Sequence, residues 1–294
     1  MLAPDEKFDS NLKEAIIRVV AFFDLFDYPL TALEISAHLE FRFRDDHLFN
    51  SVQDILDADQ NIWQQVEGFY FLSGREEIII TRQSRYNYSA RKLKIARRFV
   101  RVFSWLPSVR LIALANSIGF YNLRDGSDID FFIITEPGKI WLSRLYCTGL
   151  AKLLNSRPTA KNKRDKICLS FYISSDYLNL SSLRLPSKDP YFDYWLSGLI
   201  LLYNKKDTYN LFLSANETES GRISPVVNSR PLSPGLLERI AKTIQLKIMP
   251  PELKAAMNNS DGVVVSDQVL KFYQSDRRRE ISEKYEKKVR LILA

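Results

Sequence analysis

The segment Val109–Thr135 reads VRLIALANSIGFYNLRDGSDIDFFIIT, and it predicts two strands joined by a polar turn. The apolar run Leu111–Ala115 stops at Asn116-Ser117, two residue types that favour turns because their side chains hydrogen-bond to nearby backbone. A second apolar, β-rich run begins at Asp128 and ends before Pro137-Gly138. The pattern predicts that this pair of strands forms the centre of a sheet.

Two aspartates stand at the start of the second predicted strand. Side chains alternate across a strand, so Asp128 and Asp130 are expected on one face, about 7 Å apart along the chain. Two carboxylates on one face can bridge a pair of divalent ions, which two-metal sites hold about 4 Å apart. The alternative is that both aspartates simply end a solvated strand. The spacing therefore indicates a metal site on Asp128 and Asp130, with Mg²⁺ or Mn²⁺ as the expected ion.

A serine turn after one strand, followed by Ser-Asp-Ile-Asp at the start of the next, resembles the nucleotidyltransferase superfamily of the DNA polymerase β type. The resemblance covers roughly residues 85–230. It implies that Asp128 and Asp130 hold catalytic metal and that an NTP donates its nucleotide to an acceptor that the sequence does not identify. Asn116 stands where this family usually has glycine. The expected nucleotide-binding residues are Asn116, Ser117, Ser127, Lys139 and Arg144.

The family usually carries a third carboxylate on a later strand. The strand predicted over Ile167–Ile173 offers Ser170 at its interior, with Asp165 before it and Asp176 after it. A general base contributes about 10²–10⁴-fold to such reactions, and a serine hydroxyl is too weak a base for this role. The resemblance therefore implies nucleotide binding with weak or absent transfer.

Composition and charge limit the possible classes of protein. The 294 residues are 46% hydrophobic, with ten glycines and twelve prolines, as expected of a globular α/β (α+β) protein. Cys147 and Cys168 lie far apart in apolar segments, which predicts buried free thiols and a cytoplasmic location. The longest apolar run is too short to cross a bilayer, so no membrane partner is expected.

The net charge of +7 is divided unevenly along the chain. Residues 1–73 carry five basic and fourteen acidic side chains, a net of −9, and residues 74–294 carry 37 and 21, a net of +16. The basic part, residues 74–294, predicts an anionic substrate. The acidic N-terminal part, which we call the acidic head, is expected to have a different function.

The acidic head, residues 1–84, is expected to form a domain of its own. Helices are predicted over Asn11–Phe26, from the Thr31–Glu34 capping box to about Leu39, and over Asp46–Leu56, followed by a hairpin over Ile62–Leu72. This order resembles winged-helix modules. The third helix region bears four acids and no Lys or Arg (Asp45, Asp46, Asp54 and Asp57). Such a helix would be repelled by duplex DNA, so a protein partner is favoured over DNA.

A basic helix is predicted before the first strand of the sheet. No acid lies between Glu77 and Asp125, whereas ten Lys or Arg residues do. Four of them share one helical face: Arg91, Lys94, Arg98 and Arg101. This face either contacts phosphate or nucleic acid, or is simply solvated; the sequence leaves both interpretations open.

The remaining chain predicts helices over Pro190–Tyr203 and Asp207–Ala215, and a linker over Ser220–Pro234. Residues 231–294 are expected to form a C-terminal helical segment that contains an amphipathic helix over Leu236–Met249. Two functions remain open. The protein is either a metal-dependent nucleotidyltransferase or a non-catalytic adaptor that senses nucleotide with a degenerate site.

Overall fold

The structure, a computed structural model, describes residues 4–39, 43, 47–216, 218–219, 222–223 and 228–294. The described chain divides into two compact units, one made of residues 1–85 with 278–294 and the other of residues 86–277. The helix α4 (Ile78–Phe103) contributes residues to both units. The overall class is mixed α/β, as predicted.

The first unit contains the three helices and the hairpin that the sequence predicts. They are α1 (Pro4–Asp24), α2 (Ala32–Leu39), α3 (Leu48–Ala58), β1 (Trp63–Val66) and β2 (Phe69–Leu72). The capping box is confirmed, because the Glu34 carboxylate accepts from the Thr31 backbone N–H at 2.8 Å and the Thr31 hydroxyl accepts from Glu34 N–H at 3.2 Å. Asp45 and Asp46 lie outside the described residues.

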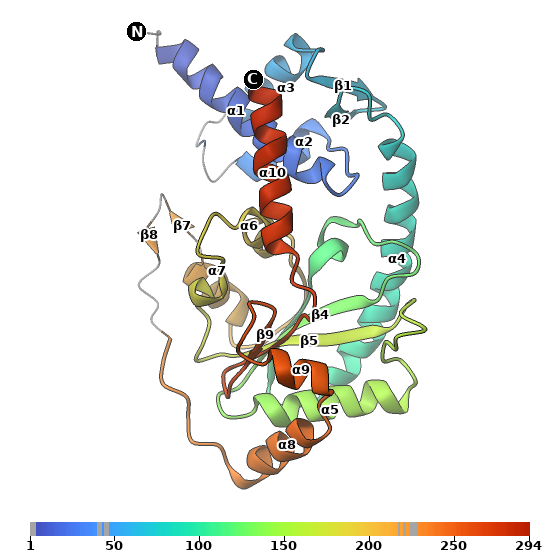
Figure 1. The fold of residues 1–294 in the computed structure, drawn as a ribbon, viewed down its shortest axis with the longest axis vertical. Coiled ribbons are helices and arrows are strands. Elements are labelled where there is room, and N and C mark those ends of the chain that lie inside the picture. Colours follow the sequence, from blue (N-terminus) through green and yellow to red (C-terminus); the bar gives the residue numbers. More distant parts are fainter. Residues whose placement is uncertain (1–3, 40–42, 44–46, 217, 220–221, 224–227) are drawn as a thin grey trace. The chain divides into compact units, whose positions relative to one another are not determined.

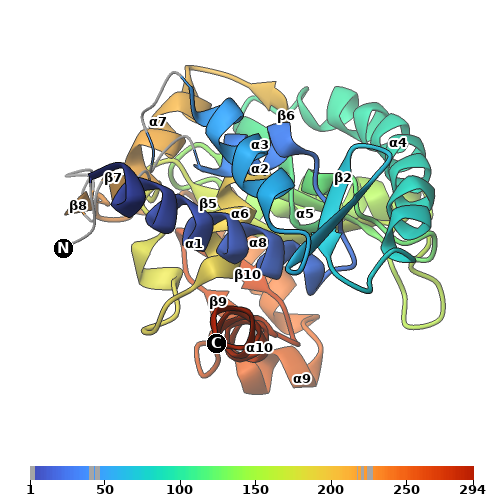
Figure 2. The same ribbon diagram turned by 90° about the horizontal axis from the view of Figure 1, so that it is seen from above.

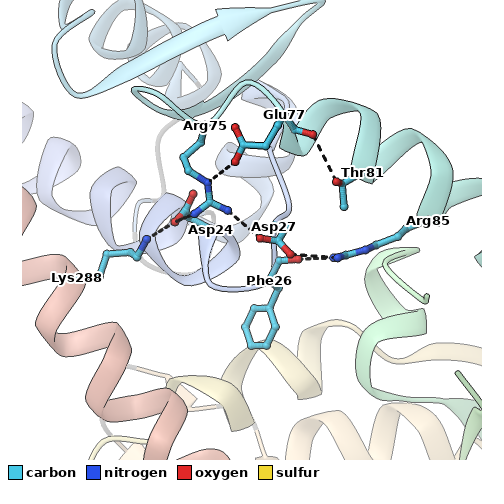
Figure 3. Close-up of polar contacts among 8 residues, drawn as sticks. All are labelled: Asp24, Phe26, Asp27, Arg75, Glu77, Thr81, Arg85 and Lys288. Atoms are coloured by element: carbon cyan, nitrogen blue, oxygen red, sulfur yellow. Dashed lines mark hydrogen bonds and ion pairs between the residues drawn. The ribbon is translucent and has the colours of Figure 1, made fainter. Parts of the chain in front are cut away.

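The last helix, α10 (Arg278–Leu293), belongs to this first unit and lies against α1 (Figure 1, Figure 2). The Tyr285 ring packs against Phe22, with ring centroids 6.0 Å apart. Lys288 forms an ion pair with Asp24, a carboxylate that is only 3% exposed (Figure 3). Residues 231–294 therefore do not form a separate helical segment, because their last helix completes the N-terminal unit.

A six-stranded mixed sheet organises the second unit. Its strand order is β6-β3-β4-β5-β10-β9, with β4 and β5 parallel and the other neighbours antiparallel. The strands are β3 (Val109–Leu114), β4 (Ile129–Thr135), β5 (Ile167–Ser174), β6 (Ile200–Asn204), β9 (Val263–Val265) and β10 (Val269–Phe272). The two C-terminal strands, which lie within residues 231–294, extend this sheet.

Helices cover both faces of the sheet. One face packs against α4, α5 (Ile140–Leu153) and α8 (Leu236–Lys247), and the other packs against α6 (Pro190–Ser197) and α7 (Thr208–Asn216). Short elements complete the unit: η1 (Asn116–Phe120), η2 (Ser181–Leu183), α9 (Pro251–Ala256), and the two-stranded ribbon of β7 (Thr218–Glu219) and β8 (Arg222–Ile223).

The helix predicted over Pro190–Tyr203 is wrong in its second half. Its helical part, α6, ends at Ser197, and the chain then enters β6, which pairs with β3 at one edge of the sheet. Gly198 lies at the break. A Cβ on Gly198 would lie 2.5 Å from the Phe120 ring, so only glycine lets the chain pass at this point without displacing that ring. An apolar run of this length does not by itself distinguish a helix from a helix followed by a buried strand.

Candidate metal-binding site

The two aspartates of the predicted motif lie together at the start of β4. Ile129, Phe131 and Ile133 point into the core beneath α4 and α5, and the alternate positions point to the other face. Asp130 therefore shares its face with Phe132 and Ile134. Ligand atoms of Asp128, Asp130 and Cys168 all lie within 4.8 Å of one another. The two carboxylates are therefore close together, as the spacing of Asp128 and Asp130 predicts.

The third member of this group, Cys168, comes from the neighbouring strand. The parallel pairing of β4 with β5 sets Asp130 directly opposite Cys168. The Cys168 sulfur lies 3.0 Å from the Ser170 hydroxyl on the same strand. Cys147 is a buried free thiol as predicted, but Cys168 is a partly exposed free thiol beside two carboxylates. The residue nearest to the aspartates on β5 is thus Cys168, two positions before the Ser170 that the sequence singled out.

The turn after β3 adjoins the same place. The backbone N–H of Ala115 donates to the Asp130 carbonyl at 3.1 Å, which holds the start of the turn against β4. Asn116 has φ +62°, a left-handed conformation that glycine adopts freely and that asparagine tolerates better than most residues. Asparagine at position 116 is therefore compatible with the backbone. Ser117 follows on the exposed side of η1, and Ser127 directly precedes Asp128.

Aromatic hydroxyls lie on the same side of the site. The Tyr191 hydroxyl, from α6, is 3.4 Å from the Asn116 side-chain oxygen. Burial raises the pKa of Tyr273 well above its usual value, and the negative charge of Asp130 raises it further. Neither tyrosine was expected at the site, since 75 residues or more separate each of them from Asn116 in the sequence.

The two aspartates give the site a negative charge that no cation of the described residues offsets. Among the described residues, no Lys, Arg or His forms an ion pair with Asp128 or Asp130. Burial raises the pKa of Asp130 to about 6, the charge of Asp128 raises it as well, and hydrogen bonding by Asn116 and Cys168 opposes the shift. Two half-buried like charges whose ligand atoms lie within 4.8 Å of each other favour a bound cation.

A buried lysine fixes the loop that leads to the aspartates. Lys92 is fully buried, and its ammonium donates to the carbonyls of Asp125 at 2.9 Å and of Ser127 at 2.6 Å. It also donates to the Asp165 carboxylate at 2.9 Å. Arg91 binds the same Asp165 at 3.0 Å and Asp125 at 2.6 Å. Asp165 is therefore held by two cations and is not a third acid of the aspartate pair.

Three other residues proposed from the sequence lie elsewhere. Asp176 follows the end of β5, whereas Cys168 and the acid pair lie at the start of β5 and β4. Lys139 and Arg144 lie at the start of α5, beyond the far end of β4. Arg144 donates to Gln245 at 2.7 Å and its guanidinium lies 4.3 Å from the Phe272 ring centroid, and burial lowers its pKa to about 10. The structure does not bring Asp176, Lys139 or Arg144 to the aspartates.

Only part of the basic face of α4 is exposed and available to bind an anion. Arg91 is engaged with Asp125 and Asp165, whereas Lys94, Arg98 and Arg101 are exposed. Arg97 is exposed next to Arg98 and was not included in the predicted face. A phosphate contact on this helix would therefore involve its second half.

The donor set defines which metals fit. Two carboxylates offer the oxygen ligands that Mg²⁺ and Mn²⁺ prefer, and a thiolate favours softer ions such as Zn²⁺. A site of two oxygens and one sulfur therefore fits Zn²⁺ better than an all-carboxylate site would, and its two carboxylates still suit Mg²⁺ or Mn²⁺. The spacing of Cys168 and Ser170, two positions apart in one predicted strand, was the sequence signal for this third donor, because it puts both side chains on one face.

The chain matches no protein-family model, no curated protein and no solved structure. In the part of the chain that the structure describes, no helix is long and apolar enough to cross a membrane. The candidate site is therefore interpreted from its own geometry.

Proposed function

We propose that this protein binds a divalent metal through Asp128 and Asp130, with Cys168 as a third donor, and binds an NTP at the adjoining Asn116-Ser117 turn. The observation that carries the proposal is the convergence of these three ligand atoms within 4.8 Å, together with the lack of an ion pair to either acid among the described residues. The resemblance of the Ser turn and the Asp-Ile-Asp strand to nucleotidyltransferases supports the nucleotide as the second ligand.

The proposed reaction class is nucleotidyl transfer. An acceptor oxygen would form a bond to the α-phosphorus of the NTP while the bond to the β-phosphate oxygen breaks, so that pyrophosphate leaves. Bound metal would stabilise the charge on the phosphates and on the leaving group. Asp128 and Asp130 would hold the metal, and the Ser117 hydroxyl with the turn amides would orient the β- and γ-phosphates.

Among the described residues, the site lacks an evident general base to remove the proton from the acceptor hydroxyl. Ser170 and Cys168 occupy the strand where a third carboxylate is expected, and Asp165 is held by Lys92 and Arg91. A serine hydroxyl is a poor base at neutral pH. We therefore expect metal-dependent nucleotide binding, with little or no transfer to generic acceptors.

A nucleotide-sensing adaptor is the second candidate. It is favoured by the thiol in place of the third acid and by the acidic N-terminal unit, which we propose as a winged-helix-like module that contacts a protein partner. The two functions differ in one measurable respect, which is release of pyrophosphate from bound NTP.

The test is a thermal unfolding measurement with Mn²⁺, with NTP and with both. Ligand at about 100 times its dissociation constant stabilises a protein by about 2.7 kcal/mol, so the midpoint should rise, and rise most with both ligands present. Asp128→Asn with Asp130→Asn should abolish the increment.

A matched control removes the same number of charges elsewhere in the unit. Asp207→Asn with Glu252→Gln changes two exposed acids, so this variant should keep the full response to Mn²⁺ and NTP. An equal response in the double aspartate variant and in the control would exclude the proposed site. Pyrophosphate release, measured on the same samples, separates the enzyme from the adaptor.

A further inference from the structure

Helix α8 carries its large apolar side chains on its exposed face. Leu236, Leu237 and Ile248 are 75%, 64% and 71% exposed. Ile240 and Ile244 are 46% and 43% exposed and, with Leu236 and Ile248, recur every four residues along the helix. Residues four apart lie on one side of a helix, so these five side chains form a single apolar stripe. We call it the α8 stripe.

The side of α8 that faces the protein is partly polar. Glu238, Ala241 and Gln245 are its buried residues. The Glu238 carboxylate accepts from the backbone N–H groups of Trp141 at 2.7 Å and Leu142 at 3.0 Å, so it caps the first turn of α5. The Gln245 amide donates to the Trp141 carbonyl at 2.7 Å. The contact between α5 and α8 thus combines these hydrogen bonds with the apolar contacts of Ala241 and Leu246.

This arrangement reverses the usual one. A surface helix of a globular protein buries its apolar side and exposes its polar side. Here the apolar stripe is exposed, and Glu238 and Gln245 are buried with their hydrogen bonds satisfied, so rotation of the helix would break those bonds. A contiguous exposed apolar surface of this kind marks a place where the protein binds another apolar surface.

The charges beside the α8 stripe indicate what that surface is. The other exposed positions of the helix are Arg239, Thr243 and Lys247. Glu238, the one acid in the sequence of α8, is buried under the helix as the cap of α5. The exposed side is therefore apolar and cationic. Two copies of this face would bring like charges together, whereas an anionic surface would complement them.

We propose that the α8 stripe binds the surface of a membrane that contains anionic lipid. An amphipathic helix with basic residues beside its apolar side lies in the plane of the interface, with the apolar side chains about 5–10 Å into the headgroup and acyl boundary. Arg239 and Lys247 would pair with lipid phosphates or carboxylates. This differs from the expectation of no membrane partner, which concerned spanning segments and did not consider a helix that lies on the surface.

The test is flotation of the full chain with vesicles of phosphatidylcholine, with and without about one third phosphatidylserine. The protein should float with the anionic vesicles and should dissociate as salt rises, because exposed charges are screened. Ile240→Ser with Ile244→Ser should weaken binding about tenfold or more, since two apolar side chains no longer insert. Arg239→Gln with Lys247→Gln should weaken binding to the anionic vesicles to a similar degree.

A control variant changes two exposed leucines outside the stripe. Leu153→Ser with Leu211→Ser, at positions 82% and 52% exposed, should leave vesicle binding unchanged. Equal flotation with uncharged and anionic vesicles, or none with either, would overturn the proposal. So would a dimer in analytical ultracentrifugation that the Ile240 and Ile244 substitutions dissociate, since the stripe would then belong to a second copy of the chain.

Discussion

The acidic residues at the two ends of strand β4 differ in whether a cation pairs with them. Glu136, directly after the strand, forms ion pairs with Arg110 and with Lys206, the latter at 3.0 Å, and hydrogen bonding to Arg110 lowers its pKa to about 2. At the start of the strand, Asp128 and Asp130 have no cationic partner among the described residues, and burial raises the pKa of Asp130 to about 6. One strand thus has a compensated acid at one end, meaning an acid in an ion pair with a basic side chain. At its other end it has an uncompensated pair of acids, which lack such an ion pair among the described residues.

In the N-terminal unit, two neighbouring acids are paired with basic side chains. Asp24 and Asp27 are three residues apart, and Arg75 bridges them, at 3.2 Å from Asp24 and 2.8 Å from Asp27 (Figure 3). Lys288 adds a second cation to Asp24, and Arg85 adds one to Asp27 at 3.1 Å. Asp128 and Asp130, in contrast, lie close together with no cationic partner among the described residues. A metal would supply the positive charge that this pair lacks.

The largest expected effect comes from breaking a compensated site. Asp24→Asn removes the charge of a carboxylate that is 3% exposed and leaves Arg75 and Lys288 facing a neutral side chain. Loss of charged hydrogen bonds at a buried site costs about 2–3 kcal/mol, which chemical denaturation should detect as a lower free energy of unfolding. A loss below about 0.5 kcal/mol would mean that compensation contributes little to stability in this protein.

A pair of variants at the two ends of β4 should show opposite signs. Glu136→Gln should lower the free energy of unfolding at pH 7 by about 1–2 kcal/mol, because the ion pairs stabilise the ionised carboxylate. A lowered pKa gives stability that is present above the unfolded value near 4 and is lost as pH falls toward 2. The difference between the variant and the wild type should therefore vanish in acid.

Asp130→Asn in chelator should instead stabilise the protein by about 1–2 kcal/mol at pH 8. A raised pKa gives stability that is fully present below the unfolded value near 4 and is lost as pH rises through about 6. The gain from the substitution should therefore shrink between pH 8 and pH 4. The same sign for Asp130→Asn and Glu136→Gln at high pH would contradict the contrast between the two ends.

Cys168 offers a way to change the metal preference of the uncompensated end. Cys168→Asp replaces the thiol that lies opposite Asp130 by an oxygen donor. Because oxygen ligands suit Mg²⁺ and thiolates suit softer ions, the ratio of Mg²⁺ to Zn²⁺ affinity should rise about tenfold, or about 1.4 kcal/mol. Isothermal titration with each metal measures this ratio, and Ser170→Asp provides the neighbouring comparison. An unchanged ratio would remove Cys168 from the ligand set.

The smallest effect is expected on the basic face of α4. Lys94, Arg98 and Arg101 are exposed, and Arg91 is already paired with Asp125 and Asp165. If the exposed three contact nucleic-acid phosphates, their replacement by Gln should reduce the slope of log affinity against log salt by about 2–3. Arg91→Gln should leave that slope unchanged. Absence of salt-dependent binding to single-stranded or duplex DNA and RNA would assign the face to solvation.

Local patterns in the sequence were sufficient for much of this account. The capping box at Thr31, the N-terminal helices and hairpin, and the two aspartates on one face all follow from residues a few positions apart. Short-range spacing determines each of these features, so each could be predicted.

The parts that could not be predicted depend on contacts distant in sequence. The alignment of Cys168 with Asp130 is set by the register of two parallel strands. Arg144 was expected at a phosphate, but Gln245, 101 residues away, binds it on the other side of the fold. The exclusion of Asp165 depends on Lys92, which occupies a fully buried position on α4. A single sequence does not specify these pairings.

Titration of the metal-free protein with Mn²⁺, with free Mn²⁺ followed by electron paramagnetic resonance, tests directly whether Asp128 and Asp130 bind a metal. We expect saturable binding by the wild type and by Asp207→Asn with Glu252→Gln, and loss of that binding in Asp128→Asn with Asp130→Asn. Wild-type binding that persists undiminished in the double aspartate variant would show that the uncompensated end of β4 is not a metal site.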